Sequence, residues 1–320
     1  MALFLSVILL QEAGAQTATK PTPALSPAPF KVTRVGDKPI ITPDLDPSIG
    51  TNINGPSIIR VPKWVERPLG KYYLYFAAHN GRSIKLAYAN AVSGPWKIYS
   101  AGALSLEKSY FTDHIASPDV VVDKEHKEIR LYYHGLTPTE RSQHTRVAIS
   151  REGLQFTAKE TPVQNGSAYW KLFKEGEYWY ALSMPGRLYR SKTGTDVFEP
   201  GPQLFPTSPV FIHCGLWRKG DELYVFYTRT GDTPERIVMS KMTVNEDWST
   251  WKLGPPFHVL APENEYEGSD LPAKTATIGA VDVRINALRD PHIFVDEGHI
   301  YLLYAVAGES GIALAEITEN

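Results

Sequence analysis

The sequence has little cysteine and no surplus of charge of either sign. Its 320 residues include one cysteine, Cys214, which excludes an internal disulfide framework. Lysine and arginine number 33 against 35 aspartates and glutamates, so the formal net charge is −2. No basic surplus favours the phosphate backbone of a nucleic acid, and we therefore expect no nucleic-acid partner.

Long apolar runs are lacking as well. The run MALFLSVILL falls short of the roughly 18 residues that a membrane span needs. The small residues Ala13-Gly14-Ala15 follow it, as at a cleavage site. We predict a signal peptide at residues 1–15, a secreted or periplasmic protein, and no membrane association after cleavage. No lysine or arginine precedes the run, which departs from the usual pattern, and an uncleaved interfacial anchor is the alternative.

A segment rich in proline, threonine and alanine follows the apolar run. Residues 16–30 include TATKPTPALSPAPF, which has no apolar pattern that could form a core. This composition is typical of a linker. We therefore predict one folded domain over residues 31–320.

The remainder of the chain repeats one β-rich unit five times. Each unit is a strand, a polar turn and an aromatic-rich strand, as in PHIFVDEGHIYLLYA, and a third short strand follows. No segment of comparable length has the apolar spacing of a helix. The units begin at Pro56, Pro118, Tyr169, Cys214 and Pro291.

Repetition of this unit predicts the architecture. A small antiparallel sheet cannot bury both of its faces alone, so each unit must pack against its neighbours. Radial packing around an axis also protects the sheet edges. We therefore predict an all-β fold, a five-bladed β-propeller. A β-sandwich is the alternative, but it would not require the same unit five times.

The first strand of each propeller blade lies nearest the central channel, so its leading end meets the leading ends of the other four. Aligning the five units by eye gives two sets of residues that we expect around the axis. The residues just before the strands are Gly55, Ser117, Ala168, His213 and Asp290. The second set is Ser57, Asp119, Trp170, Gly215 and His292.

The strand openings GPSIIRVP, ASPDVVVD and RDPHIFVD resemble those of five-bladed propeller glycoside hydrolases, the group of family 43 and the related families 32, 62 and 117. The longer segment LRDPHIFVDEGHIYLLYAVAGESGIALAEI is similar to bacterial propellers described as glycosyl hydrolases. The resemblance covers about residues 50–317. It implies a propeller that cleaves glycosidic bonds in a carbohydrate substrate.

The catalytic pattern of family 43 is only partly present. That family has an aspartate base in the first blade, an orienting aspartate in the second and a glutamate acid in the third. The second transfers onto Asp119. Gly55 occupies the first place, and the neighbouring Asn54 cannot take a proton; the third stretch, GSAYWKLF, has no glutamate. The family mechanism therefore cannot be copied onto this chain.

Glycosidic cleavage requires two carboxyl groups, one protonated and one ionised. Asp119 and Asp290 open the second and fifth units. Glu267 and Asp270 lie in the longest interval between units, and a connection of that length favours a functional face. We predict Asp290 as general base or nucleophile, Glu267 as general acid and Asp119 as the residue that shapes their charge. The reverse assignment of acid and base is the alternative.

Polar and aromatic residues near the openings complete the predicted site. Arg289 would pair with a carboxylate or a sugar hydroxyl, and His213 and His114 would bind hydroxyls or supply a proton. Trp170 and Tyr169 would offer a flat face to a sugar ring, although blade packing is their structural alternative. The predicted substrate-binding residues are Arg289, His213, His114, Trp170, Tyr169, Asn54 and Asp270.

Motifs of other enzyme classes are missing. No Gly-rich loop joins a strand to a helix, and no GxSxG nucleophile motif occurs. The histidines form no close-spaced metal signature, so we predict no metal ligand and no cofactor, with a structural calcium ion on the axis as an open alternative. A carbohydrate-binding propeller without catalysis and a polysaccharide lyase are the alternatives to a secreted glycoside hydrolase.

Overall fold

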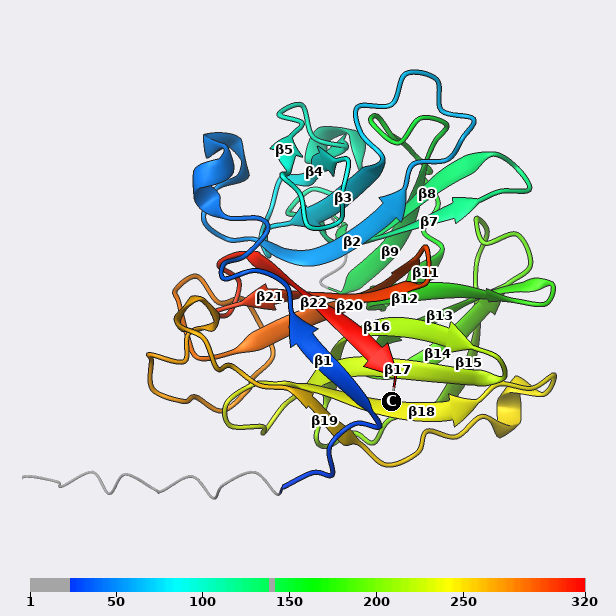
Figure 1. The fold of residues 1–320 in the computed structure, drawn as a ribbon. Coiled ribbons are helices and arrows are strands. Elements are labelled where there is room, and N and C mark those ends of the chain that lie inside the picture. Colours follow the sequence, from blue (N-terminus) through cyan, green and yellow to red (C-terminus); the bar gives the residue numbers. More distant parts are fainter. Residues whose placement is uncertain (1–23, 138–141, 320) are drawn as a thin grey trace, which may run out of the picture.

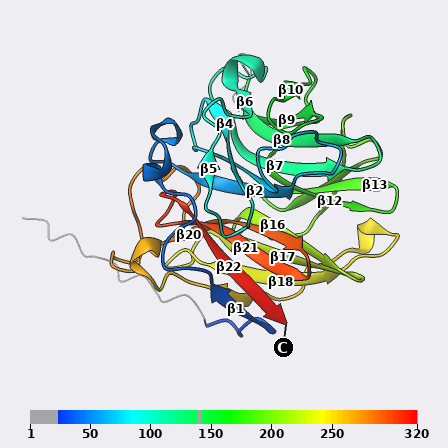
Figure 2. The ribbon, with the colours of Figure 1, turned by 45° about the horizontal axis from the view of Figure 1, so that its top comes forward.

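Five antiparallel sheets surround one axis (Figures 1 and 2). The computed structural model describes residues 24–137 and 142–319. The innermost strands of the five sheets contact each other in a closed ring. The predicted all-β fold, a five-bladed β-propeller, is confirmed.

The chain runs through each blade from the axis outward. The first blade is β2 (Asn54–Arg60), β3 (Tyr72–Ala77), β4 (Ser83–Ala89) and β5 (Lys97–Ile98), with β6 (Leu104–Ser105) also on β4. The second is β7 (Ala116–Asp123), β8 (Glu128–Leu136), β9 (Gln143–Ser150) and β10 (Thr157–Ala158), with β11 (Gln164–Asn165) also on β9. The third is β12 (Ala168–Glu175), β13 (Tyr178–Met184), β14 (Arg187–Ser191) and β15 (Glu199–Gln203).

The last two blades complete the ring. The fourth is β16 (Phe211–Lys219), β17 (Glu222–Arg229), β18 (Ile237–Thr243) and β19 (Phe257–Leu260). The fifth is β20 (Leu288–Asp296), β21 (His299–Val306), β22 (Ile312–Glu319) and, outermost, the N-terminal β1 (Phe30–Arg34). The helical turns are η1 (Pro43–Leu45), η2 (Pro47–Ile49), η3 (Leu106–Lys108), η4 (Trp248–Thr250) and η5 (Glu265–Glu267).

The hydrophobic core is divided among the interfaces between neighbouring blades. Successive side chains of a strand point to opposite faces of its sheet. In β8, Tyr133 therefore packs with Tyr73 and Tyr75 of the first blade, whereas Tyr132 packs with Trp170 of the third. Similar clusters fill the other three interfaces. Each sheet is buried on both faces, as the prediction of radial packing requires.

The N-terminal strand β1 closes the ring by pairing with the C-terminal strand β22, from Phe30 opposite Glu319 to Arg34 opposite Ala315. The described part of the predicted linker, residues 24–30, contacts the fourth blade, since Ala28 N donates to His258 O (2.8 Å). The domain therefore begins earlier than residue 31. The predicted signal peptide, residues 1–15, lies outside the described residues.

Glu267 fastens this closing strand to the fifth blade. Arg34 donates from Nε to Glu267 Oε1 (2.8 Å) and from Nη2 to Oε2 (2.9 Å), and the Tyr304 hydroxyl donates to Oε1 (2.9 Å). The main-chain N–H groups of Glu263 and Asn264 also donate to Oε2. Glu267 is fully buried at the outer side of the blade.

The predicted role of Glu267 as general acid does not fit this environment. Burial raises the pKa of its carboxyl, but the hydrogen bonds and charge of Arg34 and the two main-chain donors outweigh burial and hold the pKa below its usual value. A general acid must carry a proton, and Glu267 is ionised and accepts from six donors, of which the sixth is Asn264 Nδ2. Its role is structural.

Described residues include no helix that is long and apolar enough to cross a membrane. The helical elements among them are single turns of three residues. Strands and their connections therefore account for the described part of the molecule.

We expect Glu267→Gln to lower the free energy of unfolding by about 3 kcal/mol, because it leaves the largely buried guanidinium of Arg34 with the exposed Glu263 as its remaining counter-charge. Chemical denaturation at neutral pH measures this loss. Glu263→Gln is the control: Glu263 contacts the same Arg34 but is 68% exposed, so its loss should stay within about 0.5 kcal/mol.

The difference between the two variants should also depend on pH. Because the pKa of Glu267 is lower in the folded state than in the unfolded chain, the ionised carboxylate stabilises the fold above its unfolded pKa, and this stability is lost as pH falls. Equal stability of both variants, or a stability difference that grows in acid, would contradict the structural role of Glu267.

Candidate active site at the axis

Every inner strand contains one extra residue near its leading end, a β-bulge. In β20 the register with β21 shifts between Arg289 and His292, so that the residues between them turn out of the regular ladder. The equivalent shifts lie between Asn54 and Ser57, Ala116 and Asp119, Ala168 and Lys171, and Phe211 and Cys214. The bulges therefore define equivalent positions around the axis.

These positions confirm the alignment of three blades and correct the other two. The first residue of the bulge has a positive φ in four blades, with values of 60° at Gly55, 47° at Ser117, 57° at Tyr169 and 49° at Asp290. The third and fourth units lack the proline that follows this residue in the others. The alignment there is one residue off: Tyr169 and Lys171 replace Ala168 and Trp170, and Ile212 and Cys214 replace His213 and Gly215.

Asp290 lies at the centre of the leading end. Its Oδ2 accepts from Gly55 N of the first blade (3.0 Å), and its Oδ1 pairs with His213 Nδ1 of the fourth. A non-glycine residue with this backbone is strained, and such strain persists where the surroundings hold it. Burial raises the pKa of Asp290, but the charge and hydrogen bond of His213, the charge of Arg289 and the Gly55 donor together lower it to about 2.

The neighbouring Arg289 joins three elements through its buried guanidinium. Nε donates to Glu235 Oε2 (2.7 Å), and Nη1 donates to Glu309 Oε1 (2.9 Å). The same guanidinium donates to the carbonyls of Thr277 and Gly279 (both 2.8 Å). The predicted pairing of Arg289 with a carboxylate is present, and both partners are glutamates outside the predicted site.

Glu235 differs from the other carboxylates of this group. It is 1% exposed, and its Oε1 has no hydrogen-bond partner among the described residues. Burial raises the pKa of Glu235, and this effect outweighs the opposing charge and hydrogen bond of Arg289. A carboxyl with a raised pKa and one unused oxygen beside an ionised aspartate is a candidate general acid.

Glu309 is the third carboxylate around Arg289. Its Oε2 accepts from Asn52 (2.8 Å) and from Asn54 (3.0 Å), and its Oε1 lies 3.3 Å from His79 Nδ1. Burial and the charge of Asp290 raise the pKa of Glu309, but the hydrogen bond and charge of His79 and the hydrogen bond of Asn52 hold it below the usual range. Asn54 therefore lies in this carboxylate group near the predicted site, but it donates to Glu309 of the protein itself.

A row of rings extends from Asp290 toward the second blade. Tyr169 packs edge-on against His213 and His134, with centroids 4.3 and 4.5 Å apart, and His134 lies 6.0 Å from His114. Tyr169 is partly exposed at the leading end, whereas His213 is buried, with 8% of its surface exposed. The structure thus brings Tyr169, His213 and His114 together, as the prediction of a shared site requires.

Trp170 does not reach this site. Its indole stacks on Tyr189 (centroids 5.3 Å apart), and its Nε1 donates to Ser167 Oγ (2.7 Å). The side chain is 2% exposed, inside the interface between the second and third blades. It has no free face for a sugar ring, and its role is the blade packing named above as the alternative.

Asp119 lies on the axis, one layer below Asp290. Lys171 Nζ is 3.2 Å from its Oδ1, and Leu172 N donates to its Oδ2 (2.8 Å). Lys171 also donates to the carbonyls of Pro56 and Pro118. Burial raises the pKa of Asp119 against the effect of Lys171. Asp119 is 3% exposed and is bonded within the protein, so its position fits a supporting role.

The axis is nearly filled between these two layers. A cavity of about 10 Å³, lined by residues that include Gly55, Tyr169, His213 and Asp290, could hold about one water molecule. A larger pocket of about 240 Å³ lies beside it and is lined by Glu235, Arg289 and part of the connection between the fourth and fifth blades. A ligand would therefore approach the carboxyls from the leading end.

The long connection between β19 and β20 forms the wall of this pocket. Ala276 N donates to Asp232 O (2.8 Å) in the fourth blade, and Asn52 of the first-blade opening donates to Val281 O (3.2 Å). The connection therefore crosses the leading end of the fifth blade. Asp270 lies in it outside the carboxylate group, 3.3 Å from Arg284 and 38% exposed.

Among the described residues, one group brings three candidate metal-ligand atoms within 4.8 Å: Asp123, Glu125 and His126. It lies at the turn between β7 and β8, at the opposite end of the blade from the bulge. Asp123 is also paired there with Arg130, 2.5 Å away. The prediction of no metal ligand, with a calcium ion on the axis as the alternative, stays a prediction.

No protein-family profile matches the chain. The chain is 35% identical over 298 residues to an uncharacterized protein of Acanthamoeba polyphaga mimivirus, and the alignment covers 83% of each protein. No activity comes with that relative.

Solved structures share the fold. A family 43 β-xylosidase/α-arabinofuranosidase from a compost microbial metagenome, in complex with xylotriose, has a TM-score of 0.62 at 13% identity over 90% of this chain and 95% of that chain. A family 43 enzyme of Xanthomonas citri in complex with xylose has a TM-score of 0.59 at 12% identity, over 89% of this chain and 90% of that chain. A family 130 protein has a TM-score of 0.65 at 11% identity, over 93% of this chain and 95% of that chain. At such low sequence identity, these TM-scores show a common fold alone.

We expect His213→Gln to raise the pKa of Asp290 from about 2 toward the usual range for aspartate, because the charge of His213 and its hydrogen bond lower this pKa. NMR titration of the carboxyl carbon in labelled protein measures the shift. His299→Gln is the control, since His299 lies exposed at the other end of the same hairpin. An unchanged pKa in the His213 variant would refute the coupling.

Proposed function

Since the chain belongs to the same protein family as the uncharacterized mimivirus protein and shares its fold with propeller glycoside hydrolases, we propose that it hydrolyses glycosidic bonds at the leading end of its axis. One observation carries the proposal. Arg289 holds Glu235, whose pKa is raised, next to Asp290, whose pKa is lowered to about 2. Two carboxyls with separated pKa values are what acid and base assignments require.

Glu235 takes the role of general acid in place of Glu267. Its unpartnered Oε1 would hold the proton and deliver it to the glycosidic oxygen as the bond breaks. The Arg289 contact at Oε2 fixes the orientation of the carboxyl and stabilises the carboxylate that remains after the transfer. Glu235 regains a proton before the next cycle.

Asp290 takes the role of general base or nucleophile. Its low pKa keeps it ionised, so it can accept a proton from the attacking water or attack the anomeric carbon directly. Both routes need Asp290 ionised and Glu235 protonated. The competent pair is therefore present between the pKa of Asp290 and that of Glu235, and it is lost as pH rises through the pKa of Glu235.

Tyr169 and His213 would contact the sugar from the rim of the site. They adjoin Asp290, and the pairing of His213 with Asp290 positions the carboxylate for attack. Glu309 and Asn54 support Arg289 from the opposite side. The predicted signal peptide supports a secreted or periplasmic enzyme that acts on an external carbohydrate.

The solved neighbours suggest the first substrates to test. One is a β-xylosidase/α-arabinofuranosidase with bound xylotriose, and the family 130 work describes hydrolases that target β-1,2-mannosidic linkages in Candida mannan. Xylo-, arabino- and manno-oligosaccharides therefore form the initial panel. The sugar that the wild-type protein cleaves fastest then serves for the variants.

We expect Asp290→Asn and Glu235→Gln each to slow hydrolysis by about a hundredfold to ten-thousandfold, because each removes one partner of the acid and base pair. Product release from the chosen oligosaccharide measures the rate, and thermal unfolding confirms that the variants are folded. Asp221→Asn is the control, since Asp221 is exposed at the hairpin turn at the far end of β16.

Near-wild-type rates in both variants would remove the assignment. A wild-type protein that binds one of the oligosaccharides tightly and cleaves none of the panel would instead assign the site to carbohydrate binding without catalysis.

A further inference from the structure

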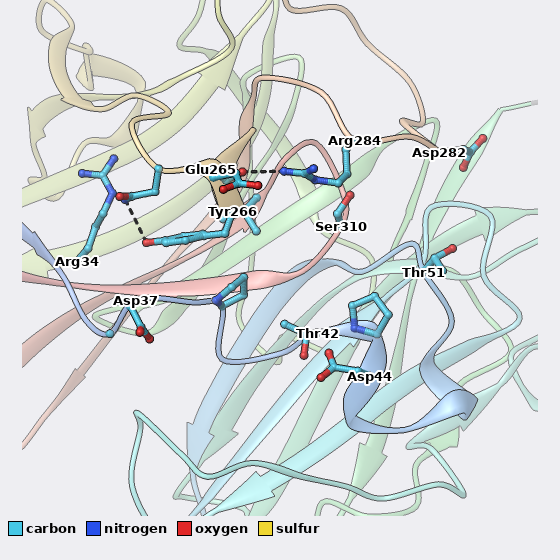
Figure 3. Close-up of a pocket in the computed structure, with 15 residues that line it drawn as sticks. Arg34, Asp37, Thr42, Asp44, Thr51, Glu265, Tyr266, Asp282, Arg284 and Ser310 are labelled. Atoms are coloured by element: carbon cyan, nitrogen blue, oxygen red, sulfur yellow. Dashed lines mark hydrogen bonds between the residues drawn. The ribbon is translucent and has the colours of Figure 1, made fainter. Parts of the chain in front are cut away.

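A groove of about 890 Å³ lies outside the axial site, at the fifth blade. One wall is the N-terminal segment between β1 and β2, and the other is the connection between β19 and β20. Figure 3 shows Tyr266 and Arg284 on one side of the space and Thr42 and Asp44 on the other. Its volume falls within the range of about 300–1,000 Å³ that is typical of small-molecule sites.

The groove adjoins the pocket beside the proposed active site. Asp282 lines both the groove and the 240 Å³ pocket that contains Glu235 and Arg289. Ser310, another lining residue, directly follows Glu309 of the axial cluster. A chain molecule with one end at Glu235 would therefore pass Asp282 and enter the groove.

The lining of the groove suits sugars. The Tyr266 ring is partly exposed and offers an apolar face, while Thr42, Thr51 and Ser310 add hydroxyl groups. Sugars combine apolar ring faces with hydroxyl groups that both donate and accept hydrogen bonds. The carboxylate of Asp282 can accept from such hydroxyls.

The free charges in the groove are negative. Its two arginines are engaged: Arg34 with Glu263 and Glu267, and Arg284 with Asp270 and the carbonyl of Glu265. The carboxylates of Asp37, Asp44, Glu265 and Asp282 are exposed, and the charge of Lys38, which does not line the groove, acts on Asp44. An anionic sugar would meet like charge here.

The arginines at the fourth-blade rim do not reverse this balance. Arg229 and Arg236 both contact the buried Asp232, at 3.2 and 3.3 Å. The exposed Lys274 lines the 240 Å³ pocket and is outnumbered by the four exposed carboxylates of the groove, so the free charge offered to a uronate or a sulfate along this path is negative on balance.

We propose that this groove binds the part of a neutral oligosaccharide chain that extends from the axial site, so that the substrate is an uncharged polysaccharide held over several sugar units. The inference rests on the proposed hydrolase function and adds the path and charge of its substrate. Tyr266 stacks on one sugar ring, and the carboxylates exclude acidic chains.

Calorimetric titration of the Asp290→Asn variant tests the groove without turnover. The probes are neutral xylo-, arabino- and manno-oligosaccharides of one to six units, together with oligogalacturonates of the same lengths. We expect affinity for the neutral series to rise with length and the oligogalacturonates to bind at least tenfold more weakly. Tyr266→Ala in the same background should weaken binding of the long neutral chains by about three- to tenfold and leave the monosaccharide unchanged.

Asp44→Lys provides a second test that does not touch the core, because Asp44 is exposed. This variant should reduce the difference in affinity between the neutral oligosaccharides and the oligogalacturonates. Affinity that does not change with length, oligogalacturonates that bind as well as neutral chains, or a Tyr266 variant with unchanged affinity for long chains would each overturn the proposal. Because binding is read directly, a protein that binds along the groove but shows no hydrolysis would overturn the proposed function alone.

Discussion

The leading end of the propeller depends on the buried guanidinium of Arg289. A charge that is 98% buried requires compensation, and Arg289 receives it from Glu235 and Glu309 and from two main-chain carbonyls. These partners come from the fourth blade, the last hairpin and the connection between the fourth and fifth blades. One side chain thus joins segments that are distant in sequence and fixes the carboxyls next to Asp290.

The same electrostatic group separates the pKa values of its carboxyls. Asp290 has a main-chain donor, His213 and the nearby Arg289, so its ionised form is favoured despite burial. Glu235 has one partner and one unpartnered oxygen, so burial dominates. Similar side chains in neighbouring positions therefore prefer opposite protonation states, which is the property on which the proposed chemistry rests.

Much of the fold was predictable because it depends on local repetition. The inner, second and third strands carry alternating apolar residues and clear turns, and the openings with an Asp-Pro or Gly-Pro pair marked Gly55 and Asp290 correctly. The outer strands were missed: β15 has the sequence EPGPQ, which has no strand propensity, and β1 pairs with the far end of the chain.

The site was less predictable because its members meet only in the closed ring. Glu235 and Glu309 lie in connections with no repeat pattern, and nothing local relates them to Arg289. For Glu267 a local indication existed: Asn264 and Glu267 have the spacing of a capping box, which the structure contains. Trp170 was misplaced because the third blade lacks the proline that marks the equivalent bulge in the first, second and fifth blades, so the alignment there was one residue off.

The most direct measurement of the central claim compares glycosides with good and poor leaving groups in the Glu235→Gln variant. A general acid matters most when the departing oxygen needs a proton. The account predicts that the variant cleaves a dinitrophenyl glycoside at close to the wild-type rate and the corresponding oligosaccharide at least a hundredfold more slowly. Equal losses on both substrates, or no loss on either, would contradict the assignment of Glu235 as the proton donor.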